Sequence, residues 1–178
     1  MPSESEAFTL IFHELFPKLC RFVEGLLNDS GSAPDIAQET LLRLYRFGIE
    51  RIPPPEIRFW AFRVARNLAL NAKARSANRN RLLEALTRLF QPAQANPETE
   101  LEQADSAALL VRLLQTLPED QRAALLLREQ EEMKYSEIAA VLGVSESKVK
   151  VDVFRARQAL RTKWHEHHRT TERRKYMN

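Results

Sequence analysis

Two segments of the chain are rich in the side chains that bind a polyanion. Residues 58–83 hold seven Lys or Arg and no acid, and residues 148–178 hold ten Lys or Arg against three acids. Between them, residues 91–109 hold four acids and no base. Because the net charge is only +3, this uneven distribution indicates two separate polyanion-binding surfaces. Solvated helix faces are the alternative interpretation of both basic runs.

The residue types that catalysis needs do not occur in a recognisable pattern. The sequence contains no nucleophile–base pair, phosphate-binding loop or metal-ligand cluster. Cys20 is the only cysteine, which excludes a disulfide within the chain and a cysteine-based zinc site. His165, His167 and His168 are not accompanied by the acidic or cysteine ligand pattern of a metal site, and we interpret residues 166–178 as a solvated basic tail. We therefore expect no enzyme, no cofactor and no small-molecule substrate.

The elements that position the basic residues are predicted to be helices, since the chain has four glycines and no alternating β pattern. Apolar residues spaced by three and four between Phe8 and Leu26 predict a long first helix, which Pro17 interrupts. A second helix starts near Pro34, ends at about Phe47 and is expected to bury Ile36, Thr40, Leu41 and Leu44.

A third helix is expected to begin near Glu56, with two contrasting faces. Its predicted core face consists of Ile57, Ala61, Val64, Leu68 and Ala72. The opposite side carries the basic residues Arg63, Arg66 and Lys73, with Phe59, Phe62 and Leu70 among them. Apolar side chains on a basic face need a partner, which can be nucleic-acid bases or the first helix. We favour the first helix for each of them taken singly.

The prolines and polar residues of the segment 91–100 predict an extended linker. Residues 81–90 fit one more short amphipathic helix before it. We therefore expect an all-α protein of two helical domains joined by a flexible linker, with domains at 1–80 and 105–165 and the linker at 81–104. The sequence has no signal-peptide core and no apolar run of about 20 residues, so we expect a cytoplasmic protein.

The segment 135–160 has the pattern of a helix-turn-helix. Ser136 is expected to cap a short helix, Gly143 to form the left-handed turn, and Ser145 to cap the next helix. The buried stripe of that second helix is predicted to be Val149, Val153, Ala156 and Leu160. Its outward face would carry Ser147, Val151, Phe154, Arg155 and Gln158, flanked by Lys148, Lys150 and Arg157. Such a helix enters the major groove of DNA, where Arg and Lys contact guanine edges or phosphates.

The stretch LPEDQRAALLLREQEEMKYSEIAAVLGVSESKVKVDVFRARQALR resembles region four of extracytoplasmic-function (ECF) sigma factors. The landmarks are Leu117-Pro118, Arg122, Tyr135, Glu137-Ile138-Ala139, Leu142-Gly143, Val149-Lys150 and Arg155-Ala156-Arg157. The resemblance implies binding to the promoter −35 element through Ser147, Lys148, Lys150, Val151, Phe154, Arg155 and Arg157. It also implies contact with the β flap of RNA polymerase.

The segment APDIAQETLLRLYR, residues 33–46, resembles region two of the same family. On a helix, Asp35, Gln38, Glu39, Leu42 and Arg46 form one exposed stripe, a surface suited to a partner helix. The resemblance implies that Asp35, Gln38, Glu39 and Leu42 grip the β-prime clamp of core RNA polymerase. Taken alone, without the neighbouring matches, the stripe is better interpreted as an ordinary solvated helix face.

The segment FWAFRVARNLALN, residues 59–71, resembles the helix of the family that binds the melted −10 element. The resemblance implies that Arg63, Arg66, Asn67, Asn71 and Lys73 hold this strand, with the Asn67 amide bonding a base. Trp60 lies at the edge of the core face, so we expect it to pack there.

Some positions depart from the family pattern. Asn71 and Ala74 replace a common aspartate and arginine, and Val151 and Asp152 replace a common Ser-Arg pair. Asp152 would repel phosphate unless it points aside or pairs with Lys148 four residues earlier. The expected function is that of a sigma factor, bound to core polymerase and promoter DNA and controlled by an anti-sigma factor. The alternatives are a stand-alone dimeric helix-turn-helix regulator and a sigma-like decoy that binds only a regulator.

Overall fold

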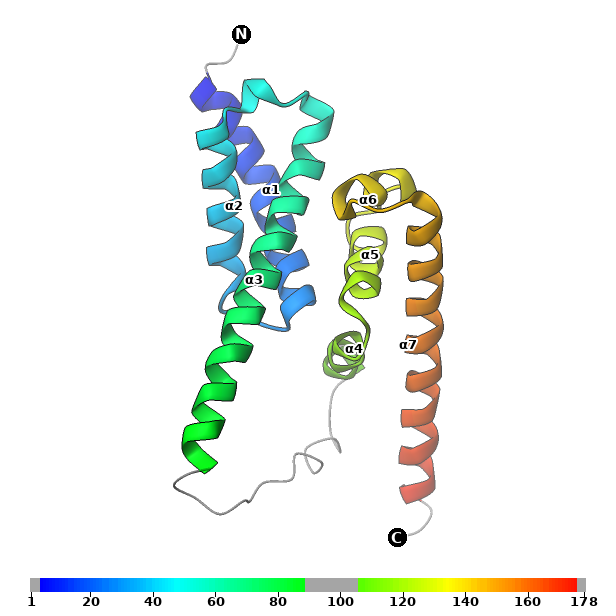
Figure 1. Cartoon of the computed structure of the whole chain (residues 1–178). Helices are drawn as coiled ribbons and strands as arrows, with labels where there is room; N and C mark the ends of the chain where they lie inside the picture. Colours follow the sequence, from blue (N-terminus) through cyan, green and yellow to red (C-terminus); the bar gives the residue numbers. More distant parts are fainter. Residues whose placement is uncertain (1–3, 89–105, 176–178) are drawn as a thin grey trace.

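The computed structural model describes residues 4–88 and 106–175, and the regular elements in both ranges are helices (Figure 1). In chain order they are α1 (Glu4–Leu27), α2 (Ala33–Phe47), the 3-10 helix η1 (Ile49–Arg51), α3 (Pro54–Arg88), α4 (Ser106–Gln115), α5 (Glu119–Glu129), α6 (Tyr135–Leu142) and α7 (Glu146–Lys175). The expected all-α fold is confirmed. The predicted linker at 91–100 lies outside the described residues.

The N-terminal domain is a bundle of α1, α2 and α3. Helix α1 contains Pro17 and extends over the whole predicted apolar pattern. The four residues that α2 was expected to bury are all buried. The turn between the two helices depends on Asp29, whose carboxylate accepts hydrogen bonds from the backbone N–H groups of Gly31 and Ser32 and from the Ser32 hydroxyl. These bonds lower the pKa of Asp29 and fix the direction in which the chain enters α2.

The buried face of α3 is wider than the sequence predicted. Ile57 and Ala61 are buried as expected, but Val64, Leu68 and Ala72 are only partly buried. The fully buried positions also include Phe62, Ala65 and Ala69. The prediction for the core face was therefore partly wrong, because it assumed that α3 packs on one side only. Helix α3 in fact contacts α1 and α2 on one side and α6 of the C-terminal domain on another.

Two aromatic predictions for the start of α3 are confirmed. The rings of Phe62 and Phe22 of α1 lie 5.3 Å apart between centroids, at an angle of 75°. Phe62 therefore packs on the first helix. Trp60 is partly buried and stacks on Phe47, with 5.9 Å between ring centroids. Edge-to-face and offset stacked contacts of this kind are the favourable arrangements of aromatic rings.

Helix α3 continues to Arg88 without the break that was expected before residue 81. The physical reason is that the sequence has no proline or glycine between residues 56 and 91. Nothing therefore interrupts the backbone hydrogen-bond ladder in this stretch. Helix α7 likewise runs to Lys175, so much of the expected tail at 166–178 is helical. None of the helices in the described ranges is both long and apolar enough to cross a membrane.

The helix-turn-helix consists of α6 and α7. Gly143 ends α6 in the left-handed conformation, and the Ser145 hydroxyl accepts the backbone N–H of Lys148 at 3.2 Å, as predicted. The predicted Ser136 cap is wrong, because α6 begins one residue before it. The Glu137 carboxylate instead accepts the backbone N–H of Lys134 at 2.7 Å, which satisfies the start of the helix.

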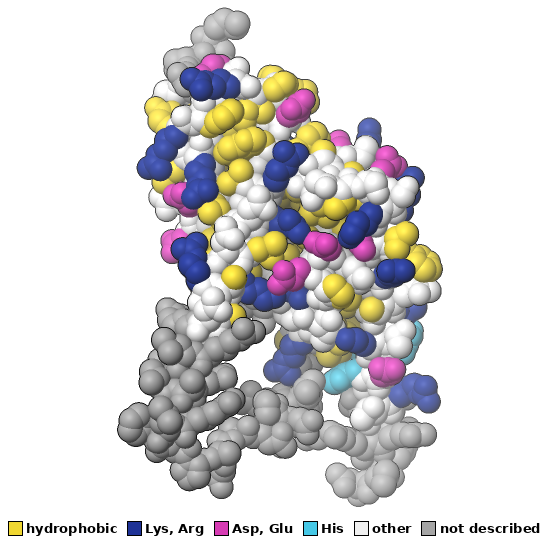
Figure 2. All heavy atoms as spheres, in the orientation of Figure 1, with side chains coloured by type: hydrophobic (Ala, Val, Ile, Leu, Met, Phe, Trp, Pro, Cys, Tyr) yellow, Lys and Arg dark blue, Asp and Glu magenta, His cyan; other side chains and the backbone are white. Residues whose placement is uncertain are grey.

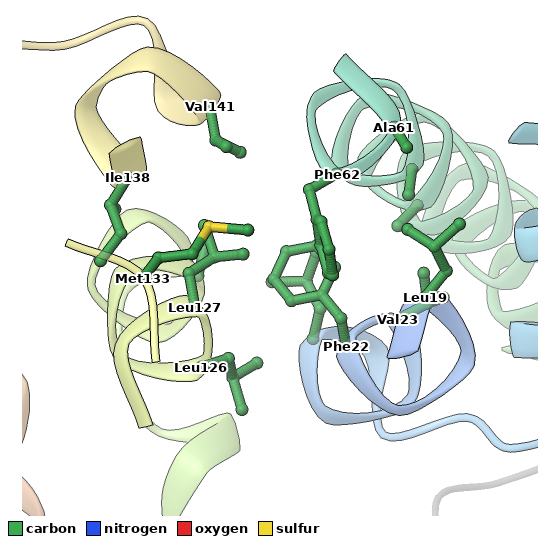
Figure 3. Close-up of a cluster of buried hydrophobic side chains, with 14 of the residues drawn as sticks. Leu19, Phe22, Val23, Ala61, Phe62, Leu126, Leu127, Met133, Ile138 and Val141 are labelled. Atoms are coloured by element: carbon green, nitrogen blue, oxygen red, sulfur yellow. The ribbon is translucent and has the colours of Figure 1, made fainter. Parts of the chain in front are cut away.

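The two domains pack against each other and share one apolar core (Figure 3). Phe22 and Phe62 of the N-terminal domain face Leu127, Met133 and Val141 of the C-terminal domain. All five side chains are almost fully buried. The sequence predicted two domains but gave no sign that they would be in contact.

Arg122 fixes the corner where α4, α5 and the end of α1 meet. The residue is 3% exposed, and its guanidinium donates five hydrogen bonds, one of them from Nη1 to the backbone carbonyl of Leu26 at 2.7 Å. The remaining acceptors belong to Leu114, Gln115 and Leu117. Burial lowers the pKa of Arg122. The carbonyl acceptors compensate for the lost hydration of the cation.

We expect Arg122→Met to lower the free energy of unfolding by about 3 kcal/mol, because five buried or partly buried acceptors lose their donor. Urea unfolding followed by circular dichroism measures the change. Arg43→Met is the matched control, since it removes only an exposed pair with Glu39 and should cost less than about 1 kcal/mol. Equal losses in the two variants would contradict the role assigned to Arg122.

Candidate nucleic-acid and partner interfaces

The outward face of α7 is open to solvent. Val149, Val153 and Ala156 are buried on the opposite side, which sets the rotation of the helix. All five residues that the sequence placed outward are exposed: Ser147, Val151, Phe154, Arg155 and Gln158. The Phe154 side chain is 60% exposed and Val151 is 44% exposed. Large apolar groups left in water beside basic side chains are typical of a surface that binds a partner.

Lys148 on this helix lies between two carboxylates. Its Nζ lies 2.5 Å from Asp152 Oδ2 and 3.6 Å from Asp120 Oδ2 on α5. The hydrogen bond with Asp152 raises the pKa of Lys148. Asp152 itself is 6% exposed, so its charge is turned away from the outward face. The predicted pairing of Asp152 with Lys148 is confirmed.

The other basic residues of α7 differ in how free they are. Lys150 pairs with Glu146 at 2.9 Å, and Arg157 donates to Glu129 of α5. That hydrogen bond raises the pKa of Arg157. Within the part of the chain that the structure describes, Arg155 makes no ion pair. Of the four basic residues assigned to the predicted −35 surface, Lys148, Lys150, Arg155 and Arg157, Arg155 is therefore the one left without an ion pair.

The predicted stripe on α2 is also accessible. Asp35, Gln38 and Leu42 are exposed, and Glu39 is partly exposed. The Glu39 carboxylate accepts Arg43 Nε at 2.7 Å, which lowers the pKa of Glu39. Leu42 has 39% of its surface in solvent although it lies in the middle of a helix. The stripe thus combines negative charge with an apolar centre.

The residues of α3 that were predicted to bind the −10 strand are only partly open to solvent. Asn67 and Asn71 are exposed. Arg63, Arg66 and Lys73 instead reach the C-terminal domain. Arg66 Nη2 lies 2.6 Å from Asp120 Oδ1, and Lys73 Nζ lies 2.6 Å from Glu119 Oε1.

Arg63 completes this set of contacts by donating to the backbone carbonyl of Ala140. In Figure 2, Lys and Arg side chains alternate with Asp and Glu along the junction of the two domains. The structure therefore brings the three basic residues together as predicted, but engages each of them within the chain.

Sequence reasoning predicted none of the ion pairs at this junction, and the pair between Arg58 and Glu131 is the most buried of them. Arg58 Nη2 donates to the Glu131 carbonyl at 2.6 Å and to Glu131 Oε2 at 3.2 Å. The Glu131 side chain is only 2% exposed, and burial raises the pKa of its carboxyl. Glu131 belongs to an acidic run in the sequence, so no local signal distinguishes it. Its role depends on a residue 73 positions away.

The fold and these surfaces define a DNA-binding protein of two helical domains. One domain presents a recognition helix, and the other carries a basic helix beside an acidic-apolar stripe. The family model described as "Sigma-70 region 2" matches residues 11–79, and that described as "Sigma-70, region 4" matches residues 107–160. The two matches follow the two structural domains in order. The chain belongs to the sigma-70 family, as a member of its ECF group.

Curated relatives match over most of their length. The chain is 29% identical over 168 residues to the ECF RNA polymerase sigma-E factor of Escherichia coli K12, covering 90% of this chain and 87% of the relative. It is 28% identical over 165 residues to the RNA polymerase sigma-H factor of Pseudomonas aeruginosa, covering 88% and 86%.

Two solved structures share the fold. One is the sigma factor RpoE in complex with the anti-sigma factor NepR from Bartonella quintana, with a TM-score of 0.66, 22% identity and coverage of 88% of this chain and 95% of that chain. The other is CnrH in complex with the cytosolic domain of CnrY, with a TM-score of 0.66, 20% identity and coverage of 91% and 90%.

We expect Lys150→Ala and Arg155→Ala each to weaken binding to duplex DNA and to reduce the slope of log K against log salt by about one unit, since each removes one phosphate-neutralising charge. Fluorescence anisotropy at several salt concentrations measures both quantities. Lys18→Ala is the control: it also removes one positive charge, but on α1, far from α7 in the sequence, and should leave the slope unchanged. Unaltered slopes for both α7 variants would move the DNA surface elsewhere.

Proposed function

We propose that this protein is an ECF sigma factor that binds core RNA polymerase and directs it to promoters, where it helps to open the DNA. The observation that carries the proposal is the presence, in one chain and in order, of both sigma-70 regions, each with an exposed surface suited to its partner. Residues 1–80 and 105–165 are the proposed functional units. The nucleotidyl-transfer chemistry belongs to the polymerase.

The stripe on α2 is the proposed contact with core polymerase. Asp35 and Gln38 offer polar groups in the two turns before Leu42, whose exposure has no role inside the domain. A helical partner that carries basic side chains around an apolar position would complement this surface. We assign this partner to the β-prime clamp, and we assign the β flap to the C-terminal domain.

The outward face of α7 is the proposed reader of the −35 element. Phosphate contacts from Lys150 and Arg157 would position the helix, while Arg155 is free to donate to a base edge. Val151 and Phe154 add apolar surface within reach of the groove. Because Asp152 is held by Lys148, its charge does not oppose the DNA.

Helix α3 is the proposed holder of the melted −10 strand. Asn67 and Asn71 present exposed amides, which bond the Watson–Crick edges of unstacked bases. Arg63, Arg66 and Lys73 would then hold the phosphates of that strand. This role requires the three basic side chains to leave their contacts with the C-terminal domain.

An anti-sigma factor is the further proposed partner. Two proteins with the same fold were solved as complexes, one with the anti-sigma factor NepR and the other with the cytosolic domain of CnrY. We propose that the protein acts in the cytoplasm together with the polymerase. The proposed function involves no small-molecule substrate.

Charge reversal on α2 tests the proposal. We expect Asp35→Lys combined with Glu39→Lys to weaken binding to core RNA polymerase at least about tenfold, because like charges then meet across the interface. The matched control is Glu14→Lys combined with Glu24→Lys, which makes the same charge change on exposed positions of α1. Co-elution with core polymerase and fluorescence titration measure the effect.

The outcomes separate the candidate functions. Binding that the α2 variant loses and the α1 variant retains supports the sigma-factor function. Equal binding by both variants would move the core contact away from α2. A folded chain that does not bind core polymerase at all would favour a stand-alone DNA-binding regulator, which should then form a dimer on a palindromic site.

A further inference from the structure

The middle of the outward face of α7 is apolar. Val151, Phe154 and Arg155 lie within one turn of the helix, at spacings of three and four residues, so they are neighbours on its surface. Val151 is 44% exposed and Phe154 is 60% exposed. Val153 and Ala156 are buried on the opposite side and fix the rotation of the helix. The apolar side chains of this face therefore stay in water unless a ligand covers them.

The two residues that flank Val151 in the sequence carry charges, and both are engaged in ion pairs. Asp152 is only 6% exposed, and its carboxylate holds Lys148 Nζ at 2.5 Å. Lys150 pairs with Glu146 at 2.9 Å. The Asp152 carboxylate is therefore kept away from the outward face, and a ligand that reaches Val151 meets the methyl groups of its side chain.

In the major groove of DNA, the group that matches an apolar surface is the C5-methyl group of thymine. The other recognition groups on the base edges there are hydrogen-bond donors and acceptors. Covering one of them with a valine or phenylalanine side chain removes its water without supplying a hydrogen bond, which costs free energy. Covering a methyl group with apolar atoms is favourable. In unmodified DNA, thymine is the base that carries this group.

The basic side chains around the apolar centre favour DNA over an apolar protein partner. Within the described residues, Arg155 makes no ion pair, and it lies one turn from Val151. An apolar protein surface over Val151 would strip water from the Arg155 guanidinium and give it no acceptor. Duplex DNA supplies acceptors for this cation on guanine edges and phosphates.

We propose that Val151 and Phe154 make α7 selective for a thymine in the −35 element, by packing on its C5-methyl group beside the base pair that Arg155 contacts. The inference rests on the proposed function, since it takes the outward face of α7 as the reader of duplex DNA. A helix rises about 1.5 Å per residue, so Val151 and Arg155 are about 6 Å apart along its axis. That distance spans about two base-pair steps. The thymine is therefore expected within about two base pairs of the guanine that Arg155 contacts.

The test begins with a selection of binding sequences. The full chain bound to core RNA polymerase selects duplexes from a randomised library, and core polymerase alone gives the background. In a selected duplex, each thymine is then replaced singly by deoxyuridine, which lacks only the C5-methyl group and pairs in the same way. Competition against the fluorescent parent duplex gives the relative affinity. We expect one replacement in the −35 element to weaken binding about fourfold, because one methyl group loses its apolar contact.

Two variants show which side chains contact the methyl group. At that thymine we expect Val151→Ala and Phe154→Ala each to reduce the preference for thymine over deoxyuridine to less than about twofold, since the methyl group then meets less apolar surface. Leu110→Ala is the matched control, because Leu110 is also 44% exposed but lies on α4. It should keep the full preference. Circular dichroism verifies that each variant is folded, and Phe154→Ala keeps the test valid if Val151→Ala is not.

The outcomes separate this inference from the proposed function. Selected −35 elements in which no deoxyuridine weakens binding would overturn the thymine readout and leave the sigma-factor function intact. A preference that both α7 variants retain in full would do the same. A chain that is dimeric in size-exclusion chromatography and becomes monomeric in Val151→Ala would assign the apolar surface to a second copy, and would also overturn the readout. If no duplex is enriched over core polymerase alone, the proposed function fails as well.

Discussion

Phe62 projects from the same face of α3 as Arg58, Arg66 and Lys73, and its ring is fully buried. Burying a phenylalanine side chain is worth about 2–3 kcal/mol, whereas an exposed ion pair contributes about 1 kcal/mol or less. Apolar contact with Phe22 and the C-terminal domain therefore decides where this face lies, and the charges around it adapt. The domain arrangement, the ion pairs at the junction and the access of ligands to α3 all depend on this packing.

As a result, the basic residues of α7 lie on an open face, whereas those of α3 lie on a covered one. On α7 the apolar stripe of Val149, Val153 and Ala156 points into its own domain, which leaves the opposite face open. On α3 the basic and apolar residues share a face. Burial of the apolar side chains against the C-terminal domain therefore also brings the basic side chains into contact with that domain. In the proposed function, an extended strand would compete with the C-terminal domain for this surface of α3, whereas duplex DNA would meet no such competitor on α7.

Local signals in the sequence were sufficient for much of the fold and for the exposed face of α7 that we propose as a DNA surface. The turn at Gly143, the Ser145 cap and the pairing of Lys148 with Asp152 involve neighbours within four residues, and all three were predicted. The Ser136 cap was wrong, since Glu137 satisfies the start of α6 instead. The buried face of α3 and its pair between Arg66 and Asp120, 54 residues apart, depend on contacts between domains that no periodic pattern reports.

Promoter-dependent transcription is the most direct measurement of the central claim. Core RNA polymerase, with and without the purified chain, would transcribe a library of templates whose upstream sequence is randomised, and the transcripts would be sequenced. The account predicts that the chain adds transcripts whose templates share two upstream elements at a fixed spacing, one for each domain. A chain that binds core polymerase yet adds no such transcripts would contradict it.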